Sequence, residues 1–348
     1  TRQLLKMFKT LTVATLASAA ALQTDDMYES KFYSWMQEHK IQFKNGAEFV
    51  QRLAIFKDNL DYILHHNAQD TTYTLGLNAY SHLTATEFTD YFHLGAVRPP
   101  MLRRGSAQMH AAPKDMTSVP SSVDWTTVSN VVTPVKDQGN CGSCWSFSAT
   151  GALEGAYAQV YPQSASWSGF SEQELVSCNT ITDSGCNGGL MDRAFSYVER
   201  NGGLCSEADY PYTSGTTTVD GTCNDSSCTI DSKLDIASHT DVETNSDDAM
   251  MSALAQQPVS IAIQANQPAF QMYKSGVMTD DCGAKLDHGV LAVGYGTLDG
   301  TDYYKVKNSW GSSWGMDGYI LLERGANVNN GAGQCGMLSG PPSYPTMA

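Results

Sequence analysis

A cysteine, a histidine and two carboxamide side chains have the types and the order needed for acyl transfer by a thiol. Cys144 would attack a carbonyl carbon, His288 would move the proton, and the neutral carboxamide of Asn308 would orient the imidazole. Gln138, together with the backbone N–H of Cys144, would donate to the developing oxyanion. These residues lie in the runs QGNCGSCW (138–145), LDHG (286–289) and KNSWG (307–311). They predict hydrolysis of peptide bonds.

The thiol of Cys144 needs help to ionise. An ordinary thiol pKa of about 8.5 leaves roughly one thiol in 3,000 ionised at pH 5. A thiolate pKa of roughly 3 to 4 requires on the order of 6 to 7 kcal/mol, whereas a helix N-terminus supplies about 0.3 to 2 kcal/mol. A histidine must therefore supply most of the shift. After residue 118 there are two, His239 in a polar stretch and His288 at the head of an apolar run, which favours His288.

The cysteine count fits a disulfide-stabilised enzyme with one free thiol. All nine cysteines lie between Cys141 and Cys335, so eight can pair in an oxidising compartment and one is left over. Zinc binding at Cys141-x-x-Cys144 lacks a second pair of ligands in this sequence. A thioredoxin-like redox motif would follow a strand, whereas residues 133–139 read as a loop. No metal and no cofactor are expected.

The charge distribution argues against polyanionic partners. Residues 1–118 carry 12 Lys and Arg against 11 Asp and Glu, and the remainder carries 9 against 25, which gives net charges of +1 and −16. A domain this acidic repels nucleic acid and anionic membrane surfaces, so neither is expected as a partner. With 41% hydrophobic residues the chain can build a globular core.

The first 118 residues read as three parts. Residues 1–21, with a possible initiator at Met7, combine a basic start, an apolar stretch and an Ala-x-Ala site, which predicts a secretory signal peptide. Residues 22–94 carry apolar side chains at helical spacing and predict a small helical module. Residues 95–118 lose this periodicity and contain Pro, Gly and an Arg pair, as expected of an exposed linker.

Residues 119–348 predict an α+β domain in two halves. A helix is expected from Cys144 to about Val160, and strand-like runs follow in the second half. These runs are Val259–Ile263, Val290–Tyr295, Tyr303–Val306 and Tyr319–Leu322. A cleft between the halves would bring a cysteine borne by a helix opposite a histidine borne by a strand.

Several motifs, in order, resemble those of the papain-like cysteine peptidases, most closely the cathepsin L-like branch. The matching strings are QGNCGSCWSF (138–147), CNGGLM (186–191), DHG (287–289) and NSWGSSWG (308–315). The prosegment motif of that branch is matched at Glu48, Arg52, Phe56, Asn59, Ile63 and Asn67. The resemblance implies a catalytic domain with a helical lobe and a β-barrel-like lobe, preceded by a small helical prodomain. It also implies a cysteine endopeptidase made as a zymogen, whose prosegment blocks Cys144.

The second prosegment motif departs from the family pattern. It reads GLNAYSH (76–82), with Tyr80 for the usual Phe and His82 for the usual Asp. A carboxylate implicated in pH sensing is thus missing. We hypothesise that His82, which gains charge on acidification, serves instead.

The resemblance also implies substrate-binding residues. The positions of the main hydrophobic subsite are Leu190, Met191, Ala262, Leu286 and Gly340. None is acidic, which predicts preference for an apolar residue over Arg two positions before the cut. Further substrate contacts are implied for Gly188, Gly189, Asp287 and Trp310.

Four disulfides are implied by the same resemblance. Two are Cys141–Cys186 and Cys282–Cys335, while Cys178 would join Cys223 or Cys228, and Cys205 would take the one left over. The loop that holds the last two also contains the sequon at Asn224.

The expected partners are protein and peptide substrates, the chain's own prosegment and cystatin-type inhibitors. The protein is expected to be a monomer of the secretory pathway, either extracellular or in a lysosome- or vacuole-like compartment. Two alternatives remain: a catalytically silent binding or storage protein on the same fold, and a secreted inhibitor built on the prosegment. The intact set of Cys144, His288, Asn308 and Gln138 argues against both.

Overall fold

The computed structural model describes residues 24–95, 108–224, 226, 228–280 and 282–348. They divide into two units, one ending at Lys57 and the other beginning at Asp58. The predicted signal peptide (1–21) and residues 96–107 of the predicted linker lie outside the described residues. Within the described ranges, helices long and apolar enough to cross a membrane are absent.

Aromatic side chains hold the first unit together. It contains α1 (Asp25–His39) and the start of α2 (Gly46–Asn67). Phe32 of α1 is fully buried, stacks on Trp35 with ring centroids 5.5 Å apart, and packs on Phe56 of α2 at 5.0 Å. An ion pair between Lys57 and Asp25, with Nζ 2.6 Å from Oδ1, links the same two helices. The helical periodicity predicted for this segment is confirmed.

In the second unit, the residues before Cys144 contribute strands as well as a helix. β1 (Tyr73–Leu75) pairs antiparallel with β6 (Tyr273–Met278), and β2 (Gln108–His110) pairs parallel with β4 (Ile236–Val242). Helix α3 (Ala85–Tyr91) starts with a capping box. The sequence did not predict the two strands, because they form by pairing with sheet edges far away in the chain.

The described part of the second unit contains a ten-stranded sheet in which nine strands follow the order β1-β6-β9-β8-β7-β5-β10-β4-β2, while β3 pairs with β7. Its remaining strands are β3 (Val123–Asp124), β5 (Val259–Ile263), β7 (His288–Leu298), β8 (Thr301–Lys307), β9 (Tyr319–Glu323) and β10 (Ser343–Met347). Four of these match the predicted strand-like runs. Every residue of β5 is buried, so the strand was visible as an apolar run.

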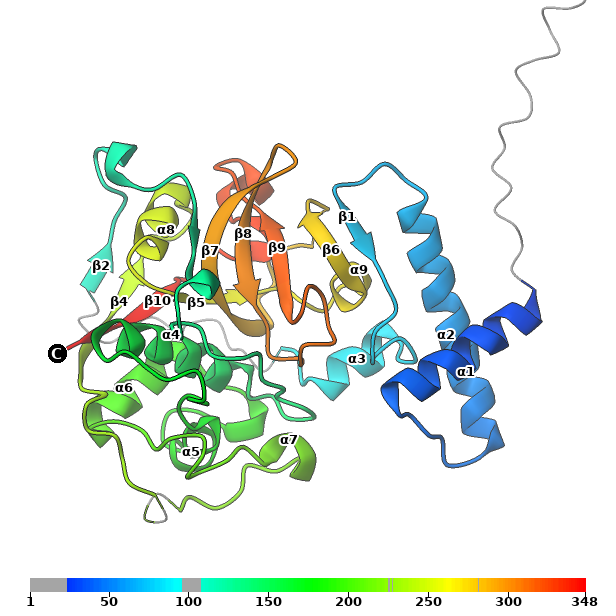
Figure 1. Ribbon diagram of the computed structural model, residues 1–348, viewed down its shortest axis with the longest axis horizontal. Coiled ribbons are helices and arrows are strands. Elements are labelled where there is room, and N and C mark those ends of the chain that lie inside the picture. Colours follow the sequence, from blue (N-terminus) through cyan, green and yellow to red (C-terminus); the bar gives the residue numbers. More distant parts are fainter. Residues whose placement is uncertain (1–23, 96–107, 225, 227, 281) are drawn as a thin grey trace, which may run out of the picture. The chain divides into compact units, whose positions relative to one another are not determined.

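Helices form the other half of the domain. Helix α4 (Cys144–Val160) lies with α5 (Glu172–Cys178) and α6 (Met191–Asn201) beside the strands (Figure 1). The remaining α-helices after α6 are α7 (Ser214–Thr217), α8 (Asp247–Leu254) and α9 (Pro268–Gln271). One hydrophobic core surrounds α4 and α6. A second is formed by side chains of the strands together with α3, α8 and α9. The predicted α+β domain with two halves is therefore confirmed.

Four disulfides are present. They join Cys141 to Cys186, Cys178 to Cys223, Cys205 to Cys228, and Cys282 to Cys335. The pairing of Cys178 that the sequence left open is therefore with Cys223. Cys144 is the ninth cysteine and has no disulfide partner.

Candidate active site

The thiol of Cys144 is buried where α4 meets β7. Cys144 is the first residue of α4, and the backbone N–H of Gly289 on β7 donates to its Sγ at 3.3 Å. The helix lies close to the strand because Gly151 has no side chain: a Cβ there would stand 2.8 Å from Leu291 Cδ2. Ser148 Oγ also donates to the carbonyl of Val290 at 2.7 Å. The structure thus places the helix-borne thiol next to the residue that follows His288.

His288 is oriented by Asn308 and covered by Trp310. Its Nε2 lies 2.8 Å from Asn308 Oδ1, which also accepts the backbone N–H of Ser309 at 2.8 Å. Because this amide oxygen can only accept, Nε2 carries the ring proton. The indole of Trp310 stacks on the imidazole with centroids 4.7 Å apart. Among the described residues nothing bonds to Nδ1, so this nitrogen is free to exchange a proton.

Gln138 is held from two sides. Its Oε1 accepts from the hydroxyl of Ser309 at 2.6 Å, its backbone N–H donates to the carbonyl of Ser309 at 2.8 Å, and its Nε2 donates to the carbonyl of Cys141 at 2.9 Å. The carbonyl of Cys141 can only accept, so it fixes Nε2 as the donor end of the amide and leaves Oε1 to accept from Ser309. Sequence reasoning missed Ser309, although its place directly after Asn308 was a usable signal.

Comparison with known proteins agrees with this arrangement. Residues 119–345 match the papain family cysteine proteases, and residues 32–88 match the cathepsin propeptide inhibitor domain. The chain belongs to the papain family of cysteine proteases.

The chain is also similar to named members of this family. A probable cysteine protease RD21B of Arabidopsis thaliana is 44% identical over 93% of this chain and 67% of its own length. The cysteine protease XCP2 of the same plant is 42% identical over 93% of this chain and 88% of its own length.

Solved structures of proforms share the fold. The proform of the ragweed pollen allergen Amb a 11 cysteine protease aligns with a TM-score of 0.80 at 36% identity, covering 93% of this chain and 96% of that one. A recombinant stem bromelain precursor aligns with a TM-score of 0.80 at 34% identity, covering 92% and 99%. This papain-family protease is therefore described as a zymogen with its inhibitory propeptide domain.

The propeptide of this protease contacts the segment that covers the histidine. Phe92 stacks on the indole of Trp310 with centroids 4.5 Å apart, and Phe88 meets the same ring edge-on at 5.0 Å. The hydroxyl of Tyr80 donates to the carbonyl of Trp310 at 3.2 Å. Beyond α3, the backbone N–H of Gly95 donates to the carbonyl of Asp287 at 3.0 Å. The segment that follows α3 thus reaches the residue that precedes His288.

The implied subsite residues of the protease lie together in part. Met191 and Ala262 belong to the core around α4, with Leu190 and Leu286 packed against it. A Cβ on Gly340 would stand 2.5 Å from Leu286 Cδ1 and 4.0 Å from Ala262 Cβ, so these three positions line one apolar surface.

The neighbouring glycines need their lack of a side chain. A Cβ on Gly189 would stand 2.5 Å from the ring of Trp145, and Gly188 has a φ of 102°. The carboxylate of Asp287, for which a substrate contact is implied, accepts the backbone N–H of Ala265 at 2.7 Å. Burial raises the pKa of Asp287 to about 6. Its side chain holds a neighbouring segment in place.

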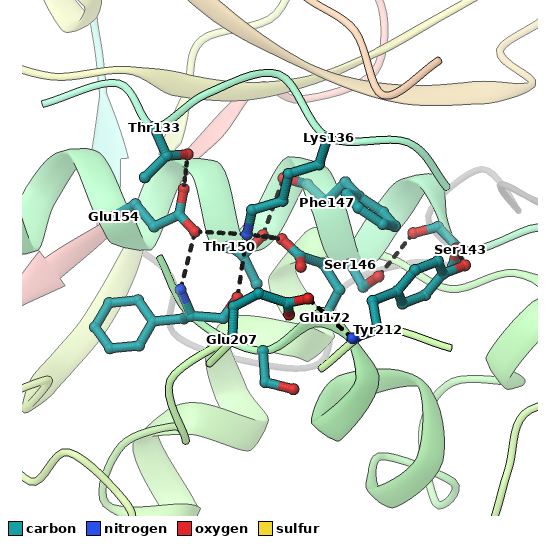
Figure 2. Close-up of polar contacts among 12 residues, drawn as sticks. Thr133, Lys136, Ser143, Ser146, Phe147, Thr150, Glu154, Glu172, Glu207 and Tyr212 are labelled. Atoms are coloured by element: carbon teal, nitrogen blue, oxygen red, sulfur yellow. Dashed lines mark hydrogen bonds and ion pairs between the residues drawn. The ribbon is translucent and has the colours of Figure 1, made fainter. Parts of the chain in front are cut away.

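A buried ionic cluster supports the nucleophile's helix in the protease (Figure 2). Lys136 Nζ lies 3.1 Å from Glu154 Oε1 and 2.6 Å from Glu172 Oε1, and Thr150 donates to the same Glu172 oxygen at 2.6 Å. Burial alone would lower the pKa of Lys136, but Glu154 and Glu172 raise it above its usual value. The ammonium is therefore the counter-ion of two buried carboxylates.

The cluster extends to the catalytic segments. Lys307 Nζ donates to the carbonyl of Thr133 at 2.7 Å, and burial lowers the pKa of Lys307 to about 8. A small cavity of about 20 Å³ is lined by residues of the cluster and of the site, among them Lys136, Glu172, Lys307 and Asn308. The charged side chains of the cluster and Asn308 thus line the same cavity.

Burial favours a neutral thiol and a neutral imidazole in the proenzyme. It raises the pKa of Cys144 to about 12, against the hydrogen bond from Gly289, and lowers the pKa of His288 to about 4, against the hydrogen bond to Asn308. An isolated charge on either group is costly here. If a thiolate and an imidazolium formed together, each charge would offset the other's cost.

Proposed function

We propose that Cys144 and His288 hydrolyse peptide bonds through a thioester acyl-enzyme. The observation that carries the proposal is the unbridged thiol that accepts the backbone N–H of Gly289, the residue after His288, whose Nε2 is held by Asn308 and whose Nδ1 is uncommitted. Nδ1 takes the thiol proton, and the thiolate of the resulting thiolate–imidazolium pair adds to the scissile carbonyl. The imidazolium then protonates the leaving amine as the C–N bond breaks.

Deacylation reverses these roles. His288 takes a proton from water, the resulting hydroxide adds to the thioester carbonyl, and the C–S bond breaks to regenerate Cys144. Gln138 Nε2 and the N–H of Cys144 stabilise the oxyanion in both steps. The donation from Gln138 Nε2 to Cys141 must then be redirected toward substrate.

Specificity is proposed to come from the apolar surface of Ala262, Leu286 and Gly340. Its residues carry no charge, so it rewards burial of Leu or Phe and leaves a guanidinium without a partner. For peptides that differ only two positions before the cut, we expect kcat/KM for Arg to be at least about tenfold below that for Leu. The Leu286→Glu variant should bring the kcat/KM values for Arg and Leu closer together, because it places a carboxylate, which can pair with a guanidinium, beside the surface. Equal kcat/KM values for Arg and Leu in the unmodified enzyme would contradict the assignment.

We propose the domain limits that the sequence suggested. Residues 22–94 form the inhibitory prodomain, residues 95–118 are the linker and cleft-blocking segment, of which 96–107 lie outside the described residues, and residues 119–348 form the peptidase. The contacts of Phe92 with Trp310 and of Gly95 with Asp287 support this division. Residues 1–21 are proposed as a signal peptide, which implies the secretory pathway and a vacuole-like or extracellular destination. We also propose that the protein is a monomer and that cystatin-type inhibitors bind to it.

Acidification is expected to loosen the end of the prosegment at His110. Its Nδ1 lies 2.9 Å from the hydroxyl of Tyr344 and its Nε2 lies 3.1 Å from Ser252 Oγ, while the backbone N–H of Ala112 donates to Glu243 Oε2 at 3.2 Å. Burial lowers the pKa of docked His110. The released residue, with a pKa of about 6.5, binds a proton more readily. Docking therefore weakens as pH falls below about 6.5.

A peptidyl epoxide that alkylates thiols tests both the site and this pH dependence. We expect Cys144 of the proenzyme to be labelled faster at pH 5 than at pH 7, and we expect His110→Gln to reduce that ratio. His65→Gln, on the exposed face of α2, is the matched control and should leave the ratio unchanged. An unchanged ratio in His110→Gln would contradict the pH assignment. Failure to label Cys144 after the prosegment has been removed would favour the alternative of a silent binding protein.

A further inference from the structure

The hydroxyl of Tyr212 joins two segments that the proposed chemistry uses. It donates to the backbone carbonyl of Gln138 at 2.8 Å and lies 2.7 Å from the hydroxyl of Ser143. The phenol has one hydrogen, which it donates to the carbonyl of Gln138. The hydroxyl of Ser143 is therefore the donor in its bond with the Tyr212 oxygen. One oxygen atom therefore connects the backbone of Gln138 to the residue that precedes Cys144.

These two segments supply the two proposed oxyanion donors. One donor is the side chain of Gln138, and the other is the peptide N–H between Ser143 and Cys144. A change in the spacing between the segments changes the distance between the donors. Preorganised donors stabilise a developing oxyanion only while they point at the place where it forms.

Close packing gives Tyr212 little freedom to move relative to these segments. Its loop lies against residues 138–140: a Cβ on Gly215 would stand 2.5 Å from the carbonyl oxygen of Gln138, and one on Gly139 would stand 2.6 Å from the carbonyl oxygen of Gly215. The backbone N–H of Asn140 donates to that same Gly215 oxygen at 3.0 Å. The approach is possible because both positions are glycine.

Tyr212 is itself held by Glu207 and by α4. Its backbone N–H donates to Glu207 Oε1 at 2.9 Å, and its ring meets the ring of Phe147 edge-on with centroids 4.9 Å apart (Figure 2). Burial raises the pKa of the Tyr212 hydroxyl above its usual value. The hydroxyl therefore keeps its proton at any pH at which the enzyme works, and the donation to Gln138 persists.

We propose that Tyr212 is a positioning residue of the oxyanion site, which acts by fixing Gln138 relative to the N–H of Cys144. The inference rests on the proposed function. Removing an oxyanion donor itself lowers kcat by about 10² to 10³. Tyr212→Phe keeps the ring and loses only the hydroxyl, so we expect kcat to fall about tenfold, a fraction of that loss, with KM changed less than about twofold.

Tyr210 supplies a matched control in the same Tyr-Pro-Tyr sequence. Its hydroxyl lies 3.4 Å from the carbonyl of Thr222 and accepts the backbone N–H of Asn224 at 3.1 Å, away from the site. Tyr210→Phe should keep kcat within about twofold of the unmodified enzyme. Each activated variant is titrated with the epoxide, so that kcat refers to competent thiols only.

A double-mutant cycle separates positioning from a general structural effect. We expect Gln138→Ala to lower kcat about 100-fold and Tyr212→Phe to add little to it, since the donor being positioned is already gone. A kcat for Tyr212→Phe equal to that of Tyr210→Phe, or a full tenfold loss on top of Gln138→Ala, would overturn the inference. Should Tyr212→Phe not fold, Ser143→Ala removes the other side of the bridge. It must then show the same selective loss of kcat.

The cycle also distinguishes a failure of the proposed function from a failure of the role of Tyr212. If Gln138→Ala keeps full kcat, the oxyanion assignment in the proposed function is wrong, and the inference falls with it. If Gln138→Ala is impaired while Tyr212→Phe is not, the proposed function stands and only the role of Tyr212 is rejected.

Discussion

Replacing Cys144 by Ser will lower kcat/KM of the activated protease by about 10⁴-fold or more. In the proposed mechanism a thiol proton moves to a buried imidazole, and a serine hydroxyl gives up its proton far less readily. The variant proenzyme must be processed by a trace of active protease, because it will not process itself. Turnover of a peptide substrate, corrected for that trace, measures the effect.

A pair of histidine variants serves as the control. His288→Ala should lose activity to a similar extent, because the thiol then has no base. His239→Ala should retain it within about twofold. This residue lies on β4 with its ring near Phe195 and no hydrogen bond to the site among the described residues. Turnover of Cys144→Ser within tenfold of the unmodified enzyme would contradict the assignment of the nucleophile.

Replacing Lys136 by Met is expected to destabilise the protein by about 3 to 5 kcal/mol, because it leaves buried carboxylates without a counter-ion. Glu154 and Glu172 are both nearly inaccessible to solvent, at 1% exposure each. They would have to bind protons or stay charged in a poorly solvated interior. Urea unfolding of the Cys144→Ser proenzyme, in which autolysis is excluded, gives the change in the free energy of unfolding.

Lys233→Met is the matched control for the loss of a lysine. Lys233 is exposed and lies over the ring of Tyr161 at 5.8 Å, so removing it should cost no more than about 1 kcal/mol. The difference between the two variants isolates the ionic cluster. A Lys136→Met protein as stable as Lys233→Met would show that Glu154 and Glu172 do not depend on the ammonium.

The sequence predicted most of the parts whose signal is local. Residues 144–160 form a helix, and the runs at 259–263 and 319–322 form strands, because their apolar patterns lie within one element. The order of Cys144, His288 and Asn308 predicted a thiol site, and the structure brings His288 into hydrogen-bonding contact with Asn308.

Parts that depend on distant pairing were missed. β1 and β2 are three residues each and exist because β6 and β4 offer partners. The hydroxyl of Tyr212 could not be related to Gln138 without the loop packing at Gly215. Burial raises the pKa of Cys144 and lowers that of His288, and residue type alone does not predict these shifts.

The strands β1 and β2 have a consequence for the protein after maturation. Both precede the proposed start of the peptidase at residue 119, and they lie at the two ends of the strand order. Removal of β1 and β2 leaves β6 and β4 as edge strands whose backbone N–H and C=O groups lose their hydrogen-bond partners. Lys274 on β6 is an exposed charged side chain of the kind that discourages self-association at a sheet edge. Removal of the prosegment would therefore also expose two edges of the sheet, where the unpaired backbone N–H and C=O groups must hydrogen-bond to water.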